Sequence, residues 1–397
     1  MSLERLYFND PFSNIVISCD IRGLTDKTII TSALKKTIVS FELLEKAVLL
    51  DDKSNLKYTS IGHACNLENI SFTDKDDLTV IKSLMSHPFA LQNGETLKTV
   101  IRSNESGYTV YFCMHHIIGD AMSLILLLKR FLVILQNMDD ININEYIPSA
   151  PETYKELNGQ SKYLVSSINK HYPHKRYSES DYLSLFEHIY GNNDLEINKI
   201  IVGKEELDGL KSCCKKLGVS LTSYIVSKIF EVQNIEILCL PTDLRTDDNC
   251  FGNYVGRIDI PLKIISGESN AESRIILIDK HIKKIRGNKA LTDDSQELLE
   301  QIQPEFYDDV IFDVYSDFSN PFVRRMAGVI GYKSTKPTMY LSNLRSVVLP
   351  YSEKLTVGNL CFYPPHPIER VSTIGIVTHN DQMIITIQKF RKEMKHE

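Results

Sequence analysis

Two consecutive histidines lie in the N-terminal half of the chain, in the segment His115-His116-Ile117-Ile118-Gly119-Asp120-Ala121. A neutral imidazole can accept a proton from a hydroxyl or an amine near neutral pH. A loop between a strand and a helix can aim such a group at a cleft, and the N–H groups of the helix start disfavour the protonated ring. The segment therefore predicts His116 as a general base. A plainer interpretation is open too, in which His115 is a buried core histidine and Asp120 only caps its helix.

The elements expected to position this segment are strands before it and a helix after it. Apolar alternation predicts antiparallel strands at Leu97–Ile101 and Tyr108–Met114, and helical spacing predicts an amphipathic helix at Ala121–Leu135. The other elements predicted in this half are strands at Asn14–Cys19, Ala47–Leu50 and Leu56–Ser60, a helix that follows an N-cap at Asp26, and a helix at Asp76–Met85.

Strands and helices also alternate in the second half. Helices are predicted at Lys204–Leu217, ended by Gly218, at Leu221–Val232, capped by Ser220, at Glu272–Ile285 and at Thr292–Ile302. Strands are predicted at Glu196–Val202, Ile235–Leu240, Thr338–Asn343, Leu355–Phe362, Thr373–His379 and Gln382–Phe390, and a further strand region comprises Ile258–Leu262 and Ile264–Ile265. Residues 136–195 lack such patterning, so we interpret them as a surface crossover. The mixed order predicts the α/β class, with two α+β two-layer sandwiches.

The composition of the chain argues against several classes of function. The chain has 397 residues and a formal charge of −6, which argues against a nucleic-acid partner. No apolar run reaches about 18 residues, so we expect no transmembrane segment, and the N-terminus lacks the pattern of a secretory signal. The eight Cys are scattered without a C-x-x-C pair, and no H-E-x-x-H occurs. We therefore expect a cytoplasmic protein without a metal site.

Several stretches in order along the chain extend the histidine motif. They are Pro88-Phe89-Ala90-Leu91 with Gly94 and Leu97, Gly218-Val219-Ser220-Leu221-Thr222, Pro241-Thr242-Asp243-Leu244-Arg245, Phe251-Gly252-Asn253 and Leu341-Ser342-Asn343-Leu344. With His115 to Ala121 they resemble the HHxxxD acyltransferase superfamily. It includes chloramphenicol acetyltransferase, condensation domains of nonribosomal peptide synthetases, polyketide-associated acyltransferases and alcohol acetyltransferases. Ala121 stands where the family usually has Gly, and the D-F-G-W-G of the plant members is absent.

The resemblance implies a fold of two chloramphenicol-acetyltransferase-like subdomains with the active-site channel between them. Under this interpretation, residues 1–165 form the N-terminal subdomain with the motif, 166–195 a crossover linker, and 196–397 the C-terminal subdomain.

The resemblance also implies roles for individual residues. His116 would be the general base, and no covalent acyl-enzyme is needed, which agrees with the absence of a G-x-S-x-G elbow. Asp120 would pair with Arg245 and fix the loop, and His115 would be structural. The candidates for binding the oxyanion or substrate are Ala121, Ser342 and Asn343.

The implied activity is transfer of an acyl group from a thioester to a hydroxyl or amine of a small-molecule acceptor, such as a secondary metabolite. The donor would be acyl-CoA or a phosphopantetheine-linked acyl group, with no permanently bound cofactor. One alternative is a free-standing condensation enzyme that forms an amide from substrates on acyl or peptidyl carrier proteins. Another is a non-catalytic relative that acts as a binding protein.

Overall fold

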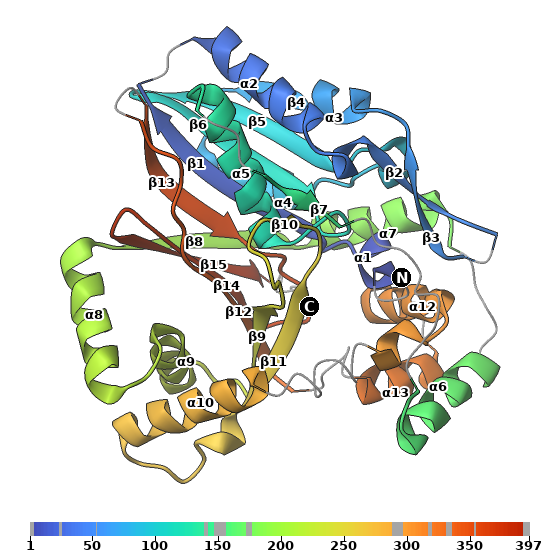
Figure 1. Cartoon of the computed structure of the whole chain (residues 1–397). Helices are drawn as coiled ribbons and strands as arrows, with labels where there is room; N and C mark the ends of the chain where they lie inside the picture. The colour runs from blue at the N-terminus through green and yellow to red at the C-terminus, as the bar shows by residue number, and fades with distance from the viewer. Residues whose placement is uncertain are drawn as a thin grey trace, which may run out of the picture.

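The structure is a computed structural model that describes residues 4–23, 26–52, 54–138, 142–146, 156–171, 177–287, 297–316, 320–330, 336–352 and 355–391. Two large sheets lie side by side, each with its own helices, and a third group of helices lies next to them (Figure 1). The predicted α/β class is therefore confirmed. No helix in the described part of the chain is long and apolar enough to cross a membrane.

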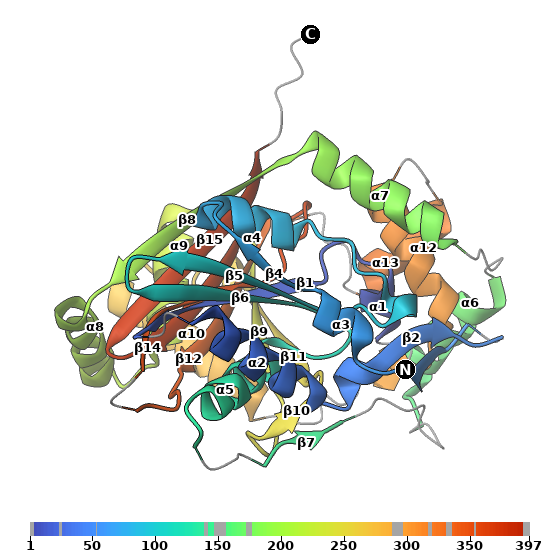
Figure 2. The same ribbon diagram turned by 90° about the horizontal axis from the view of Figure 1, so that it is seen from above.

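The first sheet carries the histidine motif. Its strand order is β13-β1-β6-β5-β4, with β1 at Asn14–Arg22, β4 at Ile70–Thr73, β5 at Leu97–Asn104, β6 at Gly107–His115 and β13 at Thr356–Tyr363. Helices α2 (Lys27–Val39) and α5 (Ala121–Leu135) cover one face and α4 (Asp77–Met85) covers the other (Figure 2). Because both faces are covered, every residue of β6 after Gly107 is buried.

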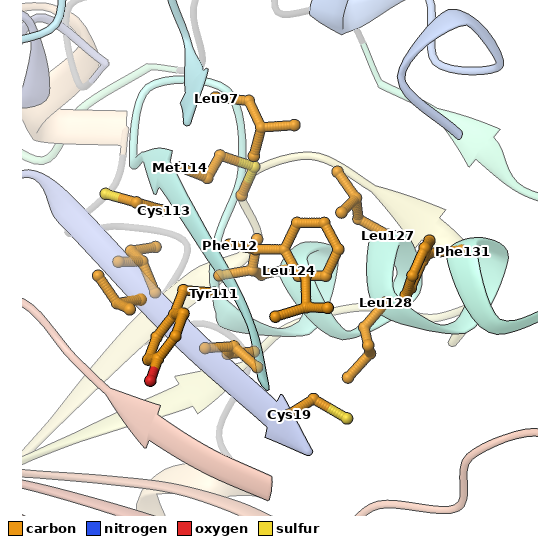
Figure 3. Packing of buried hydrophobic residues seen from close by; sticks show 14 of the residues in the cluster. Cys19, Leu97, Tyr111, Phe112, Cys113, Met114, Leu124, Leu127, Leu128 and Phe131 are labelled. Carbon is orange, nitrogen blue, oxygen red and sulfur yellow. The ribbon is translucent and has the colours of Figure 1, made fainter. Parts of the chain in front are cut away.

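Packing between β6 and α5 fixes the two ends of the motif loop. Phe112 and Met114 of β6 point toward α5, where Leu124 and Leu127 meet them (Figure 3). The rings of Phe112 and Phe131 make an edge-to-face contact with centroids 5.7 Å apart. Since the strand end and the helix start are both anchored in this core, the loop between them has little freedom.

The second sheet has the order β11-β9-β12-β14-β15-β8. Its strands are β8 at Asp194–Val202, β9 at Ile237–Asp243, β11 at Val255–Pro261, β12 at Thr338–Ser346, β14 at Thr373–His379 and β15 at Gln382–Arg391. Helices α8 (Lys204–Leu217), α9 (Leu221–Val232) and α10 (Ala271–Arg286) lie together beside this sheet (Figure 1). The predicted caps are confirmed: Gly218 ends α8 with φ 66°, and the Ser220 side chain accepts a hydrogen bond from the Ser223 N–H.

A third group of helices was not predicted. It comprises α1 (Arg5–Phe8), α6 (Gly159–His171), α7 (Glu179–Asn192), α12 (Pro304–Tyr315) and α13 (Pro321–Val329). Apolar side chains of α6, α12 and α13 form a small core of their own. The remaining short elements are α3 (Ala64–Glu68), the hairpin β2 (Lys46–Leu50) and β3 (Leu56–Ser60), the parallel pair β7 (Asn144–Glu145) and β10 (Cys250–Phe251), and the 3₁₀ turns Leu43–Glu45, Leu91–Asn93 and Leu262–Ile264.

Three expectations need correction or restriction. Residues 136–195 are not a plain crossover, because helices α6 and α7 form there. The strand region predicted at Ile258–Leu262 and Ile264–Ile265 ends at Pro261, and Leu262–Ile264 form a 3₁₀ turn. The acidic helix predicted at Thr292–Ile302 lies partly outside the described residues.

The subdomain boundaries remain a prediction, but the sheets do not divide at them. Strand β13 belongs to the second half of the sequence and pairs antiparallel with β1 in the first sheet, with Val16 opposite Tyr363. It also lies against β14 and β15 of the second sheet. This strand therefore joins the two halves of the molecule.

Candidate active site

His116 is the first residue after β6, and three chain segments surround it. Its backbone N–H donates to the Ser13 carbonyl oxygen at 2.7 Å, and its own carbonyl accepts from Asn253 Nδ2 at 3.3 Å. The ring stacks on the Tyr7 ring, with centroids 4.4 Å apart and planes 4° from parallel. The residue lines a cavity of about 530 Å³.

The surroundings of His116 keep its ring neutral. Burial lowers the pKa of the imidazole, while the negative charge of Asp120 and the ring's own backbone carbonyl partly oppose that effect. Nδ1 is buried and has no hydrogen-bond partner in the described part of the chain. Nε2 is then the ring nitrogen available to a substrate in the cavity.

His115 is the last residue of β6 and points away from this site into the core. It is 1% exposed, and burial lowers the pKa of its ring to about 3. Its Nδ1 accepts the Ile117 N–H at 3.2 Å, and its ring meets the edge of Phe89. These contacts hold the turn behind His116, and the structural role of His115 stays a prediction.

Asp120 lies at the far end of the loop and is the N-cap of α5. Its Oδ1 accepts the N–H groups of Met122 and Ser123 at 3.0 and 3.1 Å. Its Oδ2 accepts from Arg245 Nη1 at 2.8 Å and from the Tyr254 N–H at 2.9 Å. The carboxylate therefore ties the start of α5 to the segment between β9 and β11.

Arg245 completes this junction, and Ser123 is a third member that the sequence analysis did not identify. The Arg245 guanidinium donates to Ser123 Oγ at 2.9 Å and to the carbonyls of Cys250 and Gly252 at 2.8 and 3.0 Å. Ser123 Oγ in turn donates to the Gly252 carbonyl at 2.7 Å and accepts the Gly252 N–H at 2.9 Å. Ser123 is the third residue of α5, two positions after the motif, and this proximity was the only available signal.

Both halves of the chain build the cavity that His116 lines. Its wall from the first half comprises Leu6, Tyr7, Asp10, Phe12, Ile15, His116 and Ala121. The wall from the second half includes Val255 and Arg257 of β11, Tyr307 and Tyr315 of α12, Tyr340 and Ser342 of β12, and the stretch from Pro364 to Arg370.

Charged groups on this cavity are mostly paired with one another. Arg257 makes a two-pronged ion pair with Asp259 at 2.7 and 2.9 Å, and Glu369 lies 3.3 Å from Arg370. Asp10 differs, because among the described residues its carboxylate accepts a hydrogen bond only from the Phe12 N–H, at 3.0 Å. Burial, with a smaller contribution from Glu369, raises the pKa of Asp10 to about 7. No sequence pattern had indicated this residue.

Two of the three oxyanion candidates face the cavity. Ala121, the first residue of α5, and Ser342 of β12 both line it. Asn343 does not: its Nδ2 donates to Thr222 Oγ1 at 3.1 Å and its Oδ1 accepts the Arg345 N–H at 2.8 Å. Neighbouring residues of a strand point to opposite faces, so Ser342 and Asn343 cannot both serve one site.

No group of three or more metal-ligating side chains occurs among the residues that the structure describes. His115 and His116 also point in different directions, since one packs in the core against Phe89 and the other lines the cavity.

Comparison with known proteins agrees with this architecture. The family model described as "Condensation domain" matches residues 2–187. A hybrid PKS-NRPS synthetase, apdA of Emericella nidulans, is 29% identical over 133 residues, which are 31% of this chain and 3% of that synthetase. The chain thus spans only a small part of the length of this relative.

Solved structures share the fold along nearly the whole chain. Polyketide synthase associated protein 5 from Mycobacterium tuberculosis superposes with a TM-score of 0.59 at 11% identity, over 98% of this chain and 92% of that one. The condensation domain of the monacolin K polyketide synthase MokA gives 0.60 at 8% identity, over 98% and 89%. The first condensation domain of the CDA synthetase gives 0.57 at 13% identity, over 97% and 87%.

The fold is therefore the two-subdomain, chloramphenicol-acetyltransferase-like fold of condensation domains. The family match covers residues 2–187, slightly under half of the chain, and it agrees, as the fold does, with the resemblance to the HHxxxD superfamily of acyltransferases and condensation domains.

Proposed function

We propose that the protein is a transferase that moves an acyl group from a pantetheine thioester to a hydroxyl or amine of an acceptor, with His116 as general base. The observation that carries this proposal is the place of His116: its ring lines a cavity of about 530 Å³ that both halves of the chain enclose. Because burial lowers the pKa of this ring, it is neutral near pH 7 and can take a proton there.

The reaction needs no covalent enzyme intermediate. The acceptor O–H or N–H gives its proton to His116 Nε2, and the acceptor's lone pair attacks the thioester carbonyl carbon. The tetrahedral oxyanion then collapses, the C–S bond breaks with its electron pair on sulfur, and the imidazolium returns the proton to the thiolate. A single general base contributes about 10²–10⁴-fold to such a rate, and the enclosed cavity contributes by orienting the two substrates.

Two groups on the cavity wall can stabilise the oxyanion. The N–H of Ala121 lies in the first turn of α5, where backbone N–H groups have no partner within the helix. The Ser342 hydroxyl lies on the opposite wall, on β12. Donors from the two halves would then meet at the reacting carbonyl, so the position of one half relative to the other would control the rate.

The donor is a pantetheine thioester, attached either to coenzyme A or to a carrier protein. The family match and the synthetase relative favour the carrier protein, since condensation domains work within such synthetases. Under this proposal an amine acceptor gives an amide and a hydroxyl acceptor gives an ester.

The test measures thiol release with acyl-CoAs and with acyl groups loaded on a carrier protein, each with pooled alcohols and amines. Wild type is compared with His116→Ala and with a control, His188→Ala, whose side chain is exposed on α7. We expect acceptor-dependent thiol release that falls by about 10²-fold or more only in His116→Ala. The donor that supports release identifies the source of pantetheine.

Two outcomes would contradict the proposal. Equal thiol release by wild type and a folded His116→Ala would place the chemistry on another residue. No release by wild type with either donor, over the full acceptor panel, would favour a non-catalytic relative that binds acyl thioesters.

A further inference from the structure

The ring of Tyr7 stacks on the imidazole ring of His116. The two rings lie 4.4 Å apart and 4° from parallel, so the phenol covers one whole face of the imidazole. Tyr7 belongs to α1, more than a hundred residues before the motif, and also lines the cavity. Two parallel rings at this distance leave no room for water between them, so Tyr7 shields one face of the His116 ring from solvent.

The same small set of neighbours holds Tyr7 and His116. Ser13 accepts the His116 N–H at its carbonyl oxygen, and its hydroxyl donates to the Tyr7 carbonyl oxygen at 3.1 Å. Asn253 donates to the His116 carbonyl, and its side chain also interacts with the Tyr7 hydroxyl, where it opposes the increase of that group's pKa by burial. A shift of Tyr7 would therefore disturb contacts of the base as well.

Helix α1 is anchored from its other side by a buried ion pair. Arg5 Nε donates to Asp308 Oδ1 of α12 at 2.9 Å, a second guanidinium nitrogen of Arg5 pairs with Asp308 Oδ2, and Asn9 Nδ2 donates to Oδ1 at 2.9 Å. Arg5 is 2% exposed and Asp308 1%. Arg5 and Asn9 lie on either side of Tyr7 in the chain, and both are held by Asp308 of α12. Helix α12, which also lines the cavity, therefore helps to set the position of the Tyr7 ring.

We propose that Tyr7 is a positioning residue for His116: its ring fixes the plane of the imidazole and excludes water from one of its faces. The proposal depends on the proposed function only for the task that the base performs. A fixed plane keeps Nε2 directed at the acceptor proton.

The other groups that face the ring have different effects. Asp120 at the start of α5 provides a negative charge that favours the imidazolium, and His115 is a buried, neutral neighbour. Ser13 and Asn253 contact only the backbone of His116. Among the described residues, Tyr7 is thus the one whose side chain stacks on the imidazole.

The test is an NMR titration of the His116 ring, which needs no substrate, in wild type, Tyr7→Phe, Tyr7→Ala and Tyr7→Leu. A His116→Gln variant assigns the signal, and Tyr163→Ala, at a 76% exposed site, is the control. Tyr7→Phe and Tyr163→Ala should titrate as wild type does. Tyr7→Ala admits water to the ring and should move its pKa upward toward 6.5, and Tyr7→Leu should fall between the two.

A folded Tyr7→Ala or Tyr7→Leu protein whose His116 titrates as in wild type would overturn the proposal. Where acyl transfer is measurable, Tyr7→Leu should lower kcat by about tenfold with KM nearly unchanged, while Tyr7→Phe keeps kcat. If Tyr7→Ala shifts the His116 pKa but neither wild type nor any variant transfers acyl groups, the role of Tyr7 stands and the proposed function is wrong.

Discussion

Arg245 and Asp120 lie 125 positions apart in the sequence, and their side chains form a bidentate ion pair that is almost fully buried. Arg245 Nη1 donates to Oδ2 at 2.8 Å and Nη2 to Oδ1 at 2.5 Å, with side chains 1% and 3% exposed. Because both charges are buried, each one needs the other to compensate for the free energy lost when it leaves water. The hydrogen bonds that both side chains make to neighbouring backbone groups do not replace an opposite charge.

Removing one partner should therefore leave the other as a buried charge without its counter-ion, which removing both partners avoids. Asp120→Asn or Arg245→Met alone is expected to lower the free energy of unfolding by about 3–5 kcal/mol, and the double variant by less than the sum. Urea unfolding measures this. The control is Lys204→Met, which breaks an exposed 2.8 Å pair with Asp381 and should have little effect. Single variants no worse than the control would contradict the interpretation.

Ser123 should matter through its hydroxyl alone. Ser123→Ala keeps the volume of the site but leaves the buried Gly252 N–H without its hydrogen-bond partner and removes one hydrogen bond each from the Gly252 carbonyl and Arg245, so it should cost about 1–3 kcal/mol. Ser227→Ala on α9 is the matched control. Ser227 is also fully buried, but its Oγ has no partner in the described chain, so its loss should be neutral or stabilising. Equal urea midpoints for the two variants would refute this difference.

The sequence predicts an element well where the residues that start and end it lie within a few positions of it. Helices α5, α8 and α9 have the predicted bounds because Asp120, Gly218 and Ser220 mark their ends within a few residues. Helices α6, α7, α12 and α13 were missed or placed in a crossover, since their apolar residues pack partly against one another instead of a sheet.

Long-range relations were accessible only where a family resemblance supplied them. The resemblance carried by the stretch Pro241 to Arg245 suggested Arg245 as the partner of Asp120, and the two side chains are hydrogen-bonded in the structure. No local pattern reports that β13 joins β1, or that Tyr7 stacks on His116, because both contacts arise when distant segments fold together. Asn343 was included with Ser342 although strand alternation directs adjacent residues to opposite faces.

Asp10 should make the protein less stable as pH rises. Its ordinary pKa of 3.8 applies in the unfolded chain, whereas burial and then Glu369 raise the pKa in the folded protein to about 7. Between these values the folded state keeps a proton that the unfolded state has lost, so stability falls from about pH 4 to pH 7 and then levels off.

Asp10→Asn should remove this pH dependence. The amide keeps an oxygen that can accept the Phe12 N–H, so the variant should match wild type near pH 4. Above pH 7 it should be more stable by about 1–4 kcal/mol, the upper limit corresponding to three pH units of about 1.4 kcal/mol each. Urea unfolding from pH 4 to 9 measures the difference. A difference that does not grow with pH would mean that Asp10 ionises normally in the folded protein.

The rate of acyl transfer should show an acidic limb that belongs to His116. The ring must be neutral to accept a proton, and burial places its pKa below 6.5, so kcat/KM should rise with pH through a value below 6.5 and stay level above it.

Asp120 opposes this lowering of the His116 pKa, because its negative charge favours the imidazolium. Asp120→Asn should therefore move the limb to lower pH, as well as weakening the fold. Asp243→Asn is the matched control: Asp243 also pairs with Arg245, at 2.9 Å, but the carboxylate that raises the His116 pKa is that of Asp120, so the loss of Asp243 should leave the limb in place. A limb at or above pH 6.5, or one that both variants move equally, would show that a group other than His116 sets the acidic limb.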